Sequence, residues 1–231
     1  NKRSPKISYG INFMESSQTE LKKVTDLIKK ISRECKVKAM QKHATEREIP
    51  PSKSKNLDLE LTLFKNKIYS VVAVSDPKGF AQRDEVRPNF DPLKVVSIRL
   101  AKILINLAQP KKNEILLDPF AGLGTILQEA SLMNIQTIGT DNDPRTIRDC
   151  KENINWAKKK FKLKKNPQIK ILEVSKIKNL PKFNCIATEP YLGPFLMKLP
   201  TEAEAREIVK ELSELYNIFL KEASKVLNKG D

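Results

Sequence analysis

The alternation of hydrophobic and polar positions divides the 231-residue chain into two parts with different orders of elements. In the first part, residues 6–13 (KISYGINF) alternate as a strand does, and residues 18–36 place apolar side chains at helical spacing. Residues 36–40 predict another strand, residues 43–56 a loop with paired prolines, and residues 57–75 two strands joined as a hairpin. This order predicts a small α+β module.

Residues 76–92 carry three prolines, many charges and little periodicity, which is typical of a linker. We therefore expect a first module over residues 1–78, a linker over 79–92 and a second domain over 93–231. The chain stops at Gly230-Asp231, where a turn into a further strand is expected. On that pattern we expect the second domain to be truncated at its C-terminal end.

The second domain opens with an apolar stripe that predicts a helix ending before Gln109-Pro110. Short apolar runs then alternate with helical segments, and the last segment predicts a long helix over 201–227. The runs that predict strands are EILLDP, QTIGTD, QIKILE and FNCIAT. This alternation predicts an α/β fold with a parallel, doubly wound, Rossmann-like sheet, whose ligand loops follow the carboxyl ends of the strands.

Composition excludes several classes of protein. Hydrophobic residues make up 39% and charged residues 31% of the chain, and no apolar run approaches the ~18 residues that cross a bilayer. Cys35, Cys150 and Cys185 lie far apart, and His43 is the only histidine. We therefore expect a soluble, cytoplasmic protein with no membrane contact, no disulfide framework and no metal site.

The charge balance points to a polyanionic partner. Lys and Arg number 43 against 28 acidic residues, a formal net charge of +15. Such an excess favours a nucleic acid as partner, and the alternative is a lysine-rich proteome with solvated lysine faces.

The strongest local motif is residues 118–125 (DPFAGLGT), between a predicted strand and a predicted helix. Gly122 and Gly124 allow a tight turn close to a ligand, and the helix that begins near Thr125 offers free N–H groups. A dinucleotide fingerprint needs a third glycine where Leu127 stands, and a nucleotide P-loop needs a Lys-Ser/Thr ending that is missing. Both of these cofactor classes are disfavoured.

About twenty residues further on, the next strand ends in GTDNDP, where an acidic residue can bind both hydroxyls of a ribose. Asp141 is the expected ribose ligand, because Asp143 is better placed to cap the helix after Pro144.

These two motifs, DPFAGLGT and GTDNDP, resemble motifs one and two of class I methyltransferases that depend on S-adenosylmethionine. The resemblance implies that Asp118 and the turn from Gly122 to Gly124 hold the methionine part of the cofactor, that Asp141 holds the ribose, and that Glu173 contacts the adenine. The cofactor-binding residues expected on this basis are Asp118, Pro119, Phe120, Ala121, Gly122, Gly124, Thr125, Asp141, Asn142 and Glu173.

The fourth predicted strand ends in Thr188-Glu189-Pro190-Tyr191, where methyltransferases that act on amines carry (D/N)PP(Y). An exocyclic amine is a weak nucleophile because its lone pair is delocalised, and acceptors for its protons restore nucleophilicity. The resemblance implies that Tyr191 stacks on a flipped base. Thr188 and Glu189 depart from the motif, so either Glu189 supplies the acceptor or transfer is lost.

Residues 83–108 resemble the linker and first helix of the THUMP-associated tRNA guanine-N2 methyltransferases that modify guanosine 10, and the first module resembles the distal part of a THUMP domain. The resemblance implies tRNA as substrate and partner. Arg83 and Arg87 are expected to contact RNA phosphate or the cofactor pocket, or to pair with Asp84 and Glu85.

Two other functions stay open from the sequence: a noncatalytic RNA-binding protein that keeps the methyltransferase fold, and a DNA amino-methyltransferase that shares the loop chemistry. The sequence also leaves open whether the protein acts as a monomer or with a small activator subunit.

Overall fold

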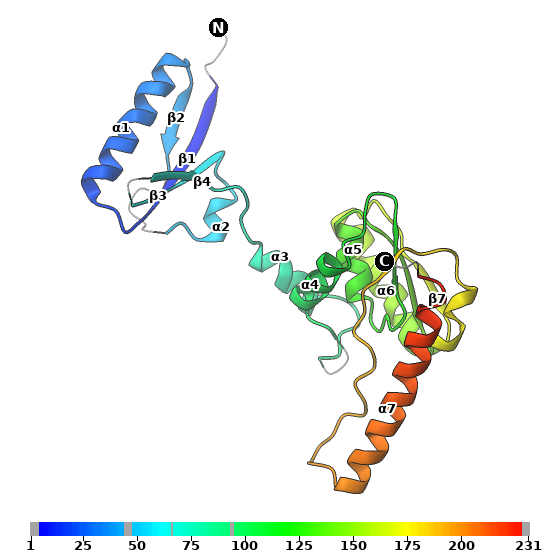
Figure 1. Ribbon diagram of the computed structural model, residues 1–231. Helices are drawn as coiled ribbons and strands as arrows, with labels where there is room; N and C mark the ends of the chain where they lie inside the picture. The colour runs from blue at the N-terminus through cyan, green and yellow to red at the C-terminus, as the bar shows by residue number, and fades with distance from the viewer. Residues whose placement is uncertain (1–4, 44–47, 66, 93–94, 228–231) are drawn as a thin grey trace. The chain divides into compact units, whose positions relative to one another are not determined.

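The structure is a computed structural model that describes residues 5–43, 48–65, 67–92 and 95–227. The chain folds as two compact units, residues 1–80 and 81–231 (Figure 1). Among the described residues, no helix combines the length and the apolar character needed to cross a membrane.

The first unit is a four-stranded sheet with a helix along one face. Strands β1 (Lys6–Met14), β2 (Lys38–Gln41), β3 (Leu59–Phe64) and β4 (Lys67–Ser70) lie in the order β2-β1-β3-β4. β1 is parallel to both neighbours, and β3 and β4 form the antiparallel pair of the expected hairpin. Helix α1 (Gln18–Glu34) begins at a Ser17–Glu20 capping box and packs Leu21 and Val24 on the sheet.

Two segments of this part differ from the sequence expectation. The expected loop over 43–56 contains a short helix, α2 (Pro51–Ser54), because Pro51 suits the first helical position; residues 44–47 lie outside the described residues. The segment 76–92, expected to be an unstructured linker, contains helix α3 (Pro77–Glu85). The boundary between the two units falls within the residues of α3.

The second unit is built on a parallel sheet, which confirms the expected α/β Rossmann-like architecture. Strands β5 (Ile115–Asp118), β6 (Gln136–Asp141), β7 (Gln168–Ile171) and β8 (Cys185–Ile186) lie in the order β7-β6-β5-β8. Each neighbouring pair is parallel, so their carboxyl ends meet at one edge. Leu116, Leu117 and Ile138 are fully buried, as central parallel strands require.

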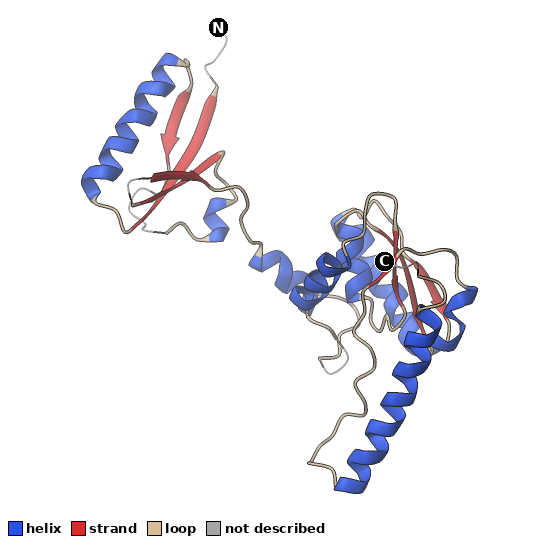
Figure 2. Ribbon diagram, in the orientation of Figure 1, coloured by secondary structure: helices blue, strands red, loops and turns tan. Residues whose placement is uncertain are grey.

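Helices pack on both faces of this sheet (Figure 2). They are α4 (Ile98–Ala108), α5 (Thr125–Leu132), α6 (Pro144–Phe161), the 3₁₀ helix η1 (Val174–Asn179) and α7 (Glu202–Ala223). Asp143 caps α6 by accepting hydrogen bonds from the backbone N–H groups of Arg145 and Thr146, with Pro144 at the first helical position. The sequence analysis predicted α4 to α7 but not η1.

Gly139 illustrates how closely α5 packs on the sheet. A Cβ atom at this position would lie 2.3 Å from Cδ1 of Leu127, a side chain that is fully buried. We expect Gly139→Ala to lower the free energy of unfolding by about 1–3 kcal/mol through overpacking, measured by urea denaturation. Combining it with Leu127→Val should cost less than the sum of the two single changes; strict additivity would contradict the contact.

Candidate active site

A pocket of about 970 Å³ opens at the carboxyl ends of the parallel strands in the second unit. Its walls come from the loops after β5, β6, β7 and β8 and from α7. Its lining includes Pro119, Phe120, Gly122, Asp141, Asn142, Glu173, Glu189, Pro190 and Tyr191. The structure thus brings the four separate sequence motifs to one cavity of the size that a ligand site has.

The loop after β5 is tied directly to the end of β6. The backbone N–H of Gly122 donates to Oδ2 of Asp141 at 3.1 Å, and the N–H of Ala121 donates to the carbonyl of Thr140 at 2.8 Å. Oδ1 of Asp141 accepts from the N–H of Asp143 at 3.0 Å. Asp141 is thereby held at the pocket wall with its carboxylate oriented by two backbone donors.

The two glycines of this loop adopt the left-handed conformation that favours glycine. Gly122 has φ of 50° and Gly124 has φ of 86°. A Cβ atom at Gly124 would lie 2.8 Å from the Sγ of Cys150 on α6. Backbone conformation and close approach of α6 therefore both require glycine at 124. Ala121, Gly124 and Thr125 support the loop from behind and do not contribute to the described pocket lining.

Asp118 and Thr188 join the ends of β5 and β8. The Thr188 hydroxyl donates to Oδ1 of Asp118 at 2.7 Å, and the backbone N–H of Phe120 donates to the same oxygen at 3.3 Å. Asp118 is 1% exposed, and this burial raises the pKa of its carboxyl to about 7, although the hydrogen bond from Thr188 lowers it. The negative charges of Asp141 and Glu189 raise the same pKa further.

Asp118 should make the folded state sensitive to pH. Its folded pKa of about 7 exceeds its ordinary value of 3.8, so the folded protein retains a proton that the unfolded chain releases between these values. Stability from this group is therefore present below pH 3.8 and lost as pH rises through 7. We expect Asp118→Asn to remove this slope and to raise stability at pH 8 by on the order of a few kcal/mol.

Thermal unfolding from pH 4 to pH 8 measures this effect. Thr188→Val deletes the donated hydrogen bond and should therefore raise the pKa of Asp118. The loss of stability with rising pH should then extend to a higher pH than in the wild type. A slope that persists in Asp118→Asn would mean that another group titrates.

The segment after β8, residues 188–195, carries the expected reaction residues, and we call it the reaction loop. Glu189, Pro190 and Tyr191 line the pocket, whereas Thr188 points to Asp118 and is absent from the described lining. The Tyr216 hydroxyl on α7 donates to the carbonyl of Tyr191 at 2.6 Å, which fixes the backbone of the reaction loop. The Tyr191 side chain is 53% exposed and open to a planar ligand.

Glu173 follows β7 and lies on the same pocket wall as Asp141. Its side chain bonds to Ser175 at 3.3 Å and pairs with Lys176 at 3.1 Å, and the Lys176 ammonium keeps the pKa of the Glu173 carboxyl below its ordinary value. Glu173 therefore lines the pocket, and its contact with the adenine stays a prediction.

The expected RNA contacts at Arg83 and Arg87 are corrected by the structure. Both side chains are buried, at 9% and 4% exposed. Arg83 makes a two-point ion pair with Glu129 on α5, at 2.8 and 3.2 Å. Buried guanidinium groups cannot meet a phosphate at the surface, so neither residue is assigned to RNA.

Five carboxylates line the pocket, and no Lys, Arg or His belongs to its described lining. These are Asp91, Asp141, Asp143, Glu173 and Glu189. The chain as a whole carries a net charge of +15, so the pocket differs in sign from the protein around it. A concave site with one sign of charge concentrates ligands of the opposite sign, which here means a cation.

Sequence reasoning missed several pocket residues. Asp91 comes from the segment expected to be a linker, and Val95 comes from the residues before α4. Phe195 comes from the reaction loop, and Leu215 and Ile218 come from α7. The described residues contain no group of three or more His, Cys, Asp or Glu side chains arranged for a metal ion.

Comparison with known proteins gives two family matches. A family model described as an RMKL-like methyltransferase domain matches residues 87–231, and one described as DNA methylase matches residues 12–152. Each match covers more than half of the chain. The first includes the whole pocket, whereas the second ends before β8 and the reaction loop.

Individual relatives agree with the first match. A tRNA (guanine(10)-N2)-dimethyltransferase of Methanocaldococcus jannaschii is 31% identical over 161 residues, 68% of this chain and 44% of that protein. One of the same name from Methanothermobacter thermautotrophicus is 39% identical over 84 residues, 36% of this chain and 25% of that protein. The chain thus spans less than half the length of these two relatives.

Among solved structures, one described as a methylase of Clostridium difficile 630 has a TM-score of 0.51 and 18% identity, and covers 98% of this chain and 64% of that one. This likeness concerns the fold alone.

Proposed function

Because the chain belongs to the family of RMKL-like methyltransferase domains, we propose that it transfers a methyl group from S-adenosylmethionine to the N2 amine of a guanosine in tRNA. Guanosine 10 is the proposed target, since the relatives from Methanocaldococcus and Methanothermobacter are named for that position. The observation that carries the proposal is the acidic pocket at the carboxyl ends of the parallel strands.

The chemistry of the pocket suits this cofactor better than a nucleotide or dinucleotide. When bound, S-adenosylmethionine supplies an electrophilic methyl group on a positively charged sulfonium. The five lining carboxylates, of which Glu173 is paired with Lys176, favour such a ligand and disfavour a pyrophosphate. The glycine turn at 122–124 lets the backbone approach the cofactor closely.

Each acidic residue of the pocket has a proposed role set by its position. Asp141 accepts hydrogen bonds from the two ribose hydroxyls, because its carboxylate is held at the end of β6 by two backbone donors. Glu173, at the end of β7, lies beside the adenine. The loop of Pro119 to Gly122 holds the methionine part, and Asp118, which is buried and outside the described lining, supports this loop through the Phe120 N–H.

The reaction loop acts on the base. Glu189 accepts a hydrogen bond from the exocyclic amine and takes its proton as the new N–C bond forms and the S–C bond breaks. Tyr191 stacks on the base, which must leave its helix to reach the pocket. Thr188 positions the end of β8 through Asp118, so the acceptor role falls to Glu189.

The first unit is proposed to be a THUMP-like RNA-binding module over residues 1–78, followed by a connection over 79–92. Exposed lysines at 22, 23, 29 and 30 give α1 the basic surface that a phosphate backbone requires.

The deciding experiment is methyl transfer from radiolabelled S-adenosylmethionine by the full-length protein to unmodified tRNA, followed by nucleoside mass analysis. N2-methylguanosine or its dimethyl form at position 10 is expected. Loss of labelling in a tRNA transcript that carries adenosine at position 10 would identify guanosine 10 as the methylated nucleotide. Cofactor and tRNA binding without any label would instead support a noncatalytic RNA-binding protein.

A DNA amino-methyltransferase is the second candidate, because a DNA methylase model matches residues 12–152. That match excludes Glu189 and Tyr191, whereas the match over 87–231 includes them. Duplex DNA assayed beside tRNA separates the two: methyladenine or methylcytosine in DNA would favour the second candidate.

A further inference from the structure

The segment 83–91 attaches to α5 and α6, next to the loop of residues 119–124 that we call the cofactor loop, through three polar contacts. Arg83 pairs with Glu129 on α5, the Arg87 Nη1 donates to the Thr125 hydroxyl at 2.8 Å, and Asn89 bonds to Asn153 on α6. We call these three contacts the clasp. Glu129, Thr125 and Asn153 are 1%, 3% and 2% exposed.

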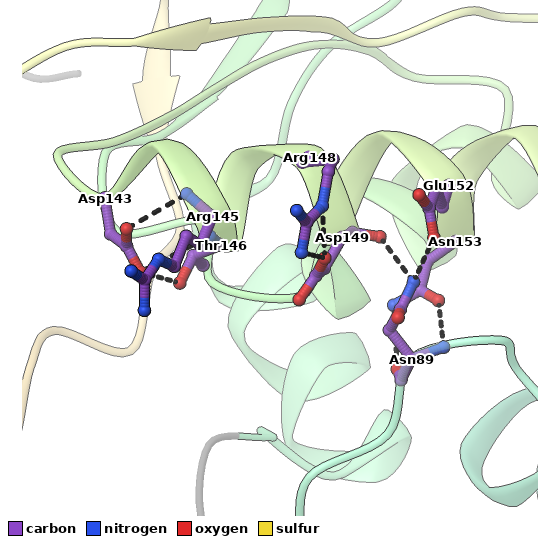
Figure 3. A network of polar contacts seen from close by, with 8 residues as sticks. All are labelled: Asn89, Asp143, Arg145, Thr146, Arg148, Asp149, Glu152 and Asn153. Carbon is purple, nitrogen blue, oxygen red and sulfur yellow. Dashed lines mark hydrogen bonds and ion pairs between the residues drawn. The ribbon is translucent and has the colours of Figure 1, made fainter.

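Asn153 is the centre of the clasp because it joins three segments. Its Oδ1 accepts from the backbone N–H of Asn89 at 2.9 Å, and its Nδ2 donates to the Asn89 carbonyl and to the Leu123 carbonyl, both at 3.0 Å. Figure 3 shows Asn89 facing α6, with Asn153 and Glu152 directed toward it. The amide thus holds Asn89 with its acceptor and one donated bond, and holds Leu123, between the two glycines, with its other donated bond.

A contribution to stability does not by itself explain why Arg87 is buried. Its side chain is 4% exposed, and its Nε and Nη2 have no hydrogen-bond partner among the described residues. Unpaired buried donors cost free energy, and an apolar side chain of similar volume would avoid that cost. The one bond that Arg87 makes through Nη1 goes to Thr125, the first residue of α5 after the glycine turn.

The clasp and the pocket share the same short loop. Leu123, whose carbonyl Asn153 holds, lines the pocket, and the neighbouring Gly122 N–H orients Asp141. Asp91, two residues beyond Asn89, also lines the pocket. A shift of the Leu123 carbonyl would therefore move the turn and the ribose-binding carboxylate together.

We propose that Asn153 and Arg87 are positioning residues that set the geometry of the cofactor loop, so that residues 83–89 influence cofactor affinity without lining the pocket. This inference rests on the proposed function for the identity of the cofactor. The geometry of the loop itself can be tested without any ligand.

The first comparison pairs Asn153→Ala with Asn184→Ala in the full-length protein. Asn184 also lies in the second unit and accepts a backbone bond from Ile115 at 3.0 Å, but at the amino ends of the strands. Asn153→Ala should weaken binding of S-adenosylmethionine by about tenfold in calorimetry. Asn184→Ala should keep the wild-type dissociation constant even where its melting temperature falls.

A second pair guards against an unfolded variant. Thr125→Val removes the acceptor of the Arg87 bond while preserving shape, and Thr125→Ser preserves the acceptor. Weaker cofactor binding in Thr125→Val with near-normal binding in Thr125→Ser would support the clasp. Equal losses in the two variants, or a loss in Asn184→Ala equal to that in Asn153→Ala, would overturn it.

Hydrogen exchange of the ligand-free protein separates the inference from the proposed function. Amides of residues 120–124 should exchange faster in Asn153→Ala than in Asn184→Ala, because only the first change releases the Leu123 carbonyl. Unchanged exchange refutes the clasp whatever the cofactor is. If the wild type fails to bind S-adenosylmethionine but the exchange difference is present, the proposed function fails and the clasp stands.

Discussion

Replacing Glu189 with glutamine is expected to lower the rate of methyl transfer by about two to four orders of magnitude, which is the usual contribution of a positioned proton acceptor. Glutamine keeps the size of the side chain but cannot take the proton of the amine. Cofactor binding should change little. Single-turnover transfer to tRNA measures the chemical step, and calorimetry measures cofactor binding.

The matched control is Glu173→Gln, which removes one negative charge from the same pocket at the end of β7. We expect this change to act on cofactor affinity and to leave the rate at saturating cofactor near the wild-type value. A Glu189→Gln protein that transfers methyl groups at the wild-type rate would show that the acceptor lies elsewhere, for instance in a backbone carbonyl of the reaction loop.

Asp141→Ala is expected to weaken cofactor binding by about a hundredfold or more. Hydrogen bonds to a charged group contribute about 1.5–3 kcal/mol each, and the proposed role gives Asp141 two of them to the ribose. The substitution also releases the Gly122 N–H, which Asp141 accepts at 3.1 Å. Calorimetric titration with S-adenosylhomocysteine avoids turnover and reports the change in affinity.

Asp143→Asn provides the comparison, since Asp143 lies two residues away and lines the same pocket. Asparagine preserves an acceptor for the cap of α6 but removes the charge. If both variants weaken cofactor binding equally, the negative charge of the pocket accounts for the affinity and the ribose contact does not. The assignment of Asp141 as the ribose ligand would then fail.

Much of the second unit could be predicted because its signals are local. Apolar runs bounded by turns predicted β5 to β8, and the glycines at 122 and 124 predicted a tight turn at the end of β5. Parallel strands place the ends of all four motifs at one edge, so Asp141, Glu173 and Glu189 could be expected in one pocket from topology. Predicting this fold did not require the long-range side-chain contacts to be known.

The segment 76–92 shows where local signals fail. Its prolines and charges indicate a linker, and its arginines indicate contact with a polyanion. In the structure Arg83 forms an ion pair with Glu129, which is 46 residues away in sequence, and Asn89 forms hydrogen bonds with Asn153, which is 64 residues away. The hydrophobic periodicity of the sequence does not indicate such pairs, because Glu129 on α5 and Asn153 on α6 each fit the pattern of their own helix.

The sequence by itself determined the parallel α/β architecture, the glycine turn and the carboxylates that end the strands, since backbone preference and burial act over a few residues. Only the tertiary structure decided what those groups do to one another. Burial raises the pKa of Asp118 to about 7, and the pairing of β5 with β8 brings the Thr188 hydroxyl within hydrogen-bond distance of it. The packing of α6 places the Asn153 amide against the Leu123 carbonyl. These properties depend on the desolvation and distance that folding creates between residues remote in the chain.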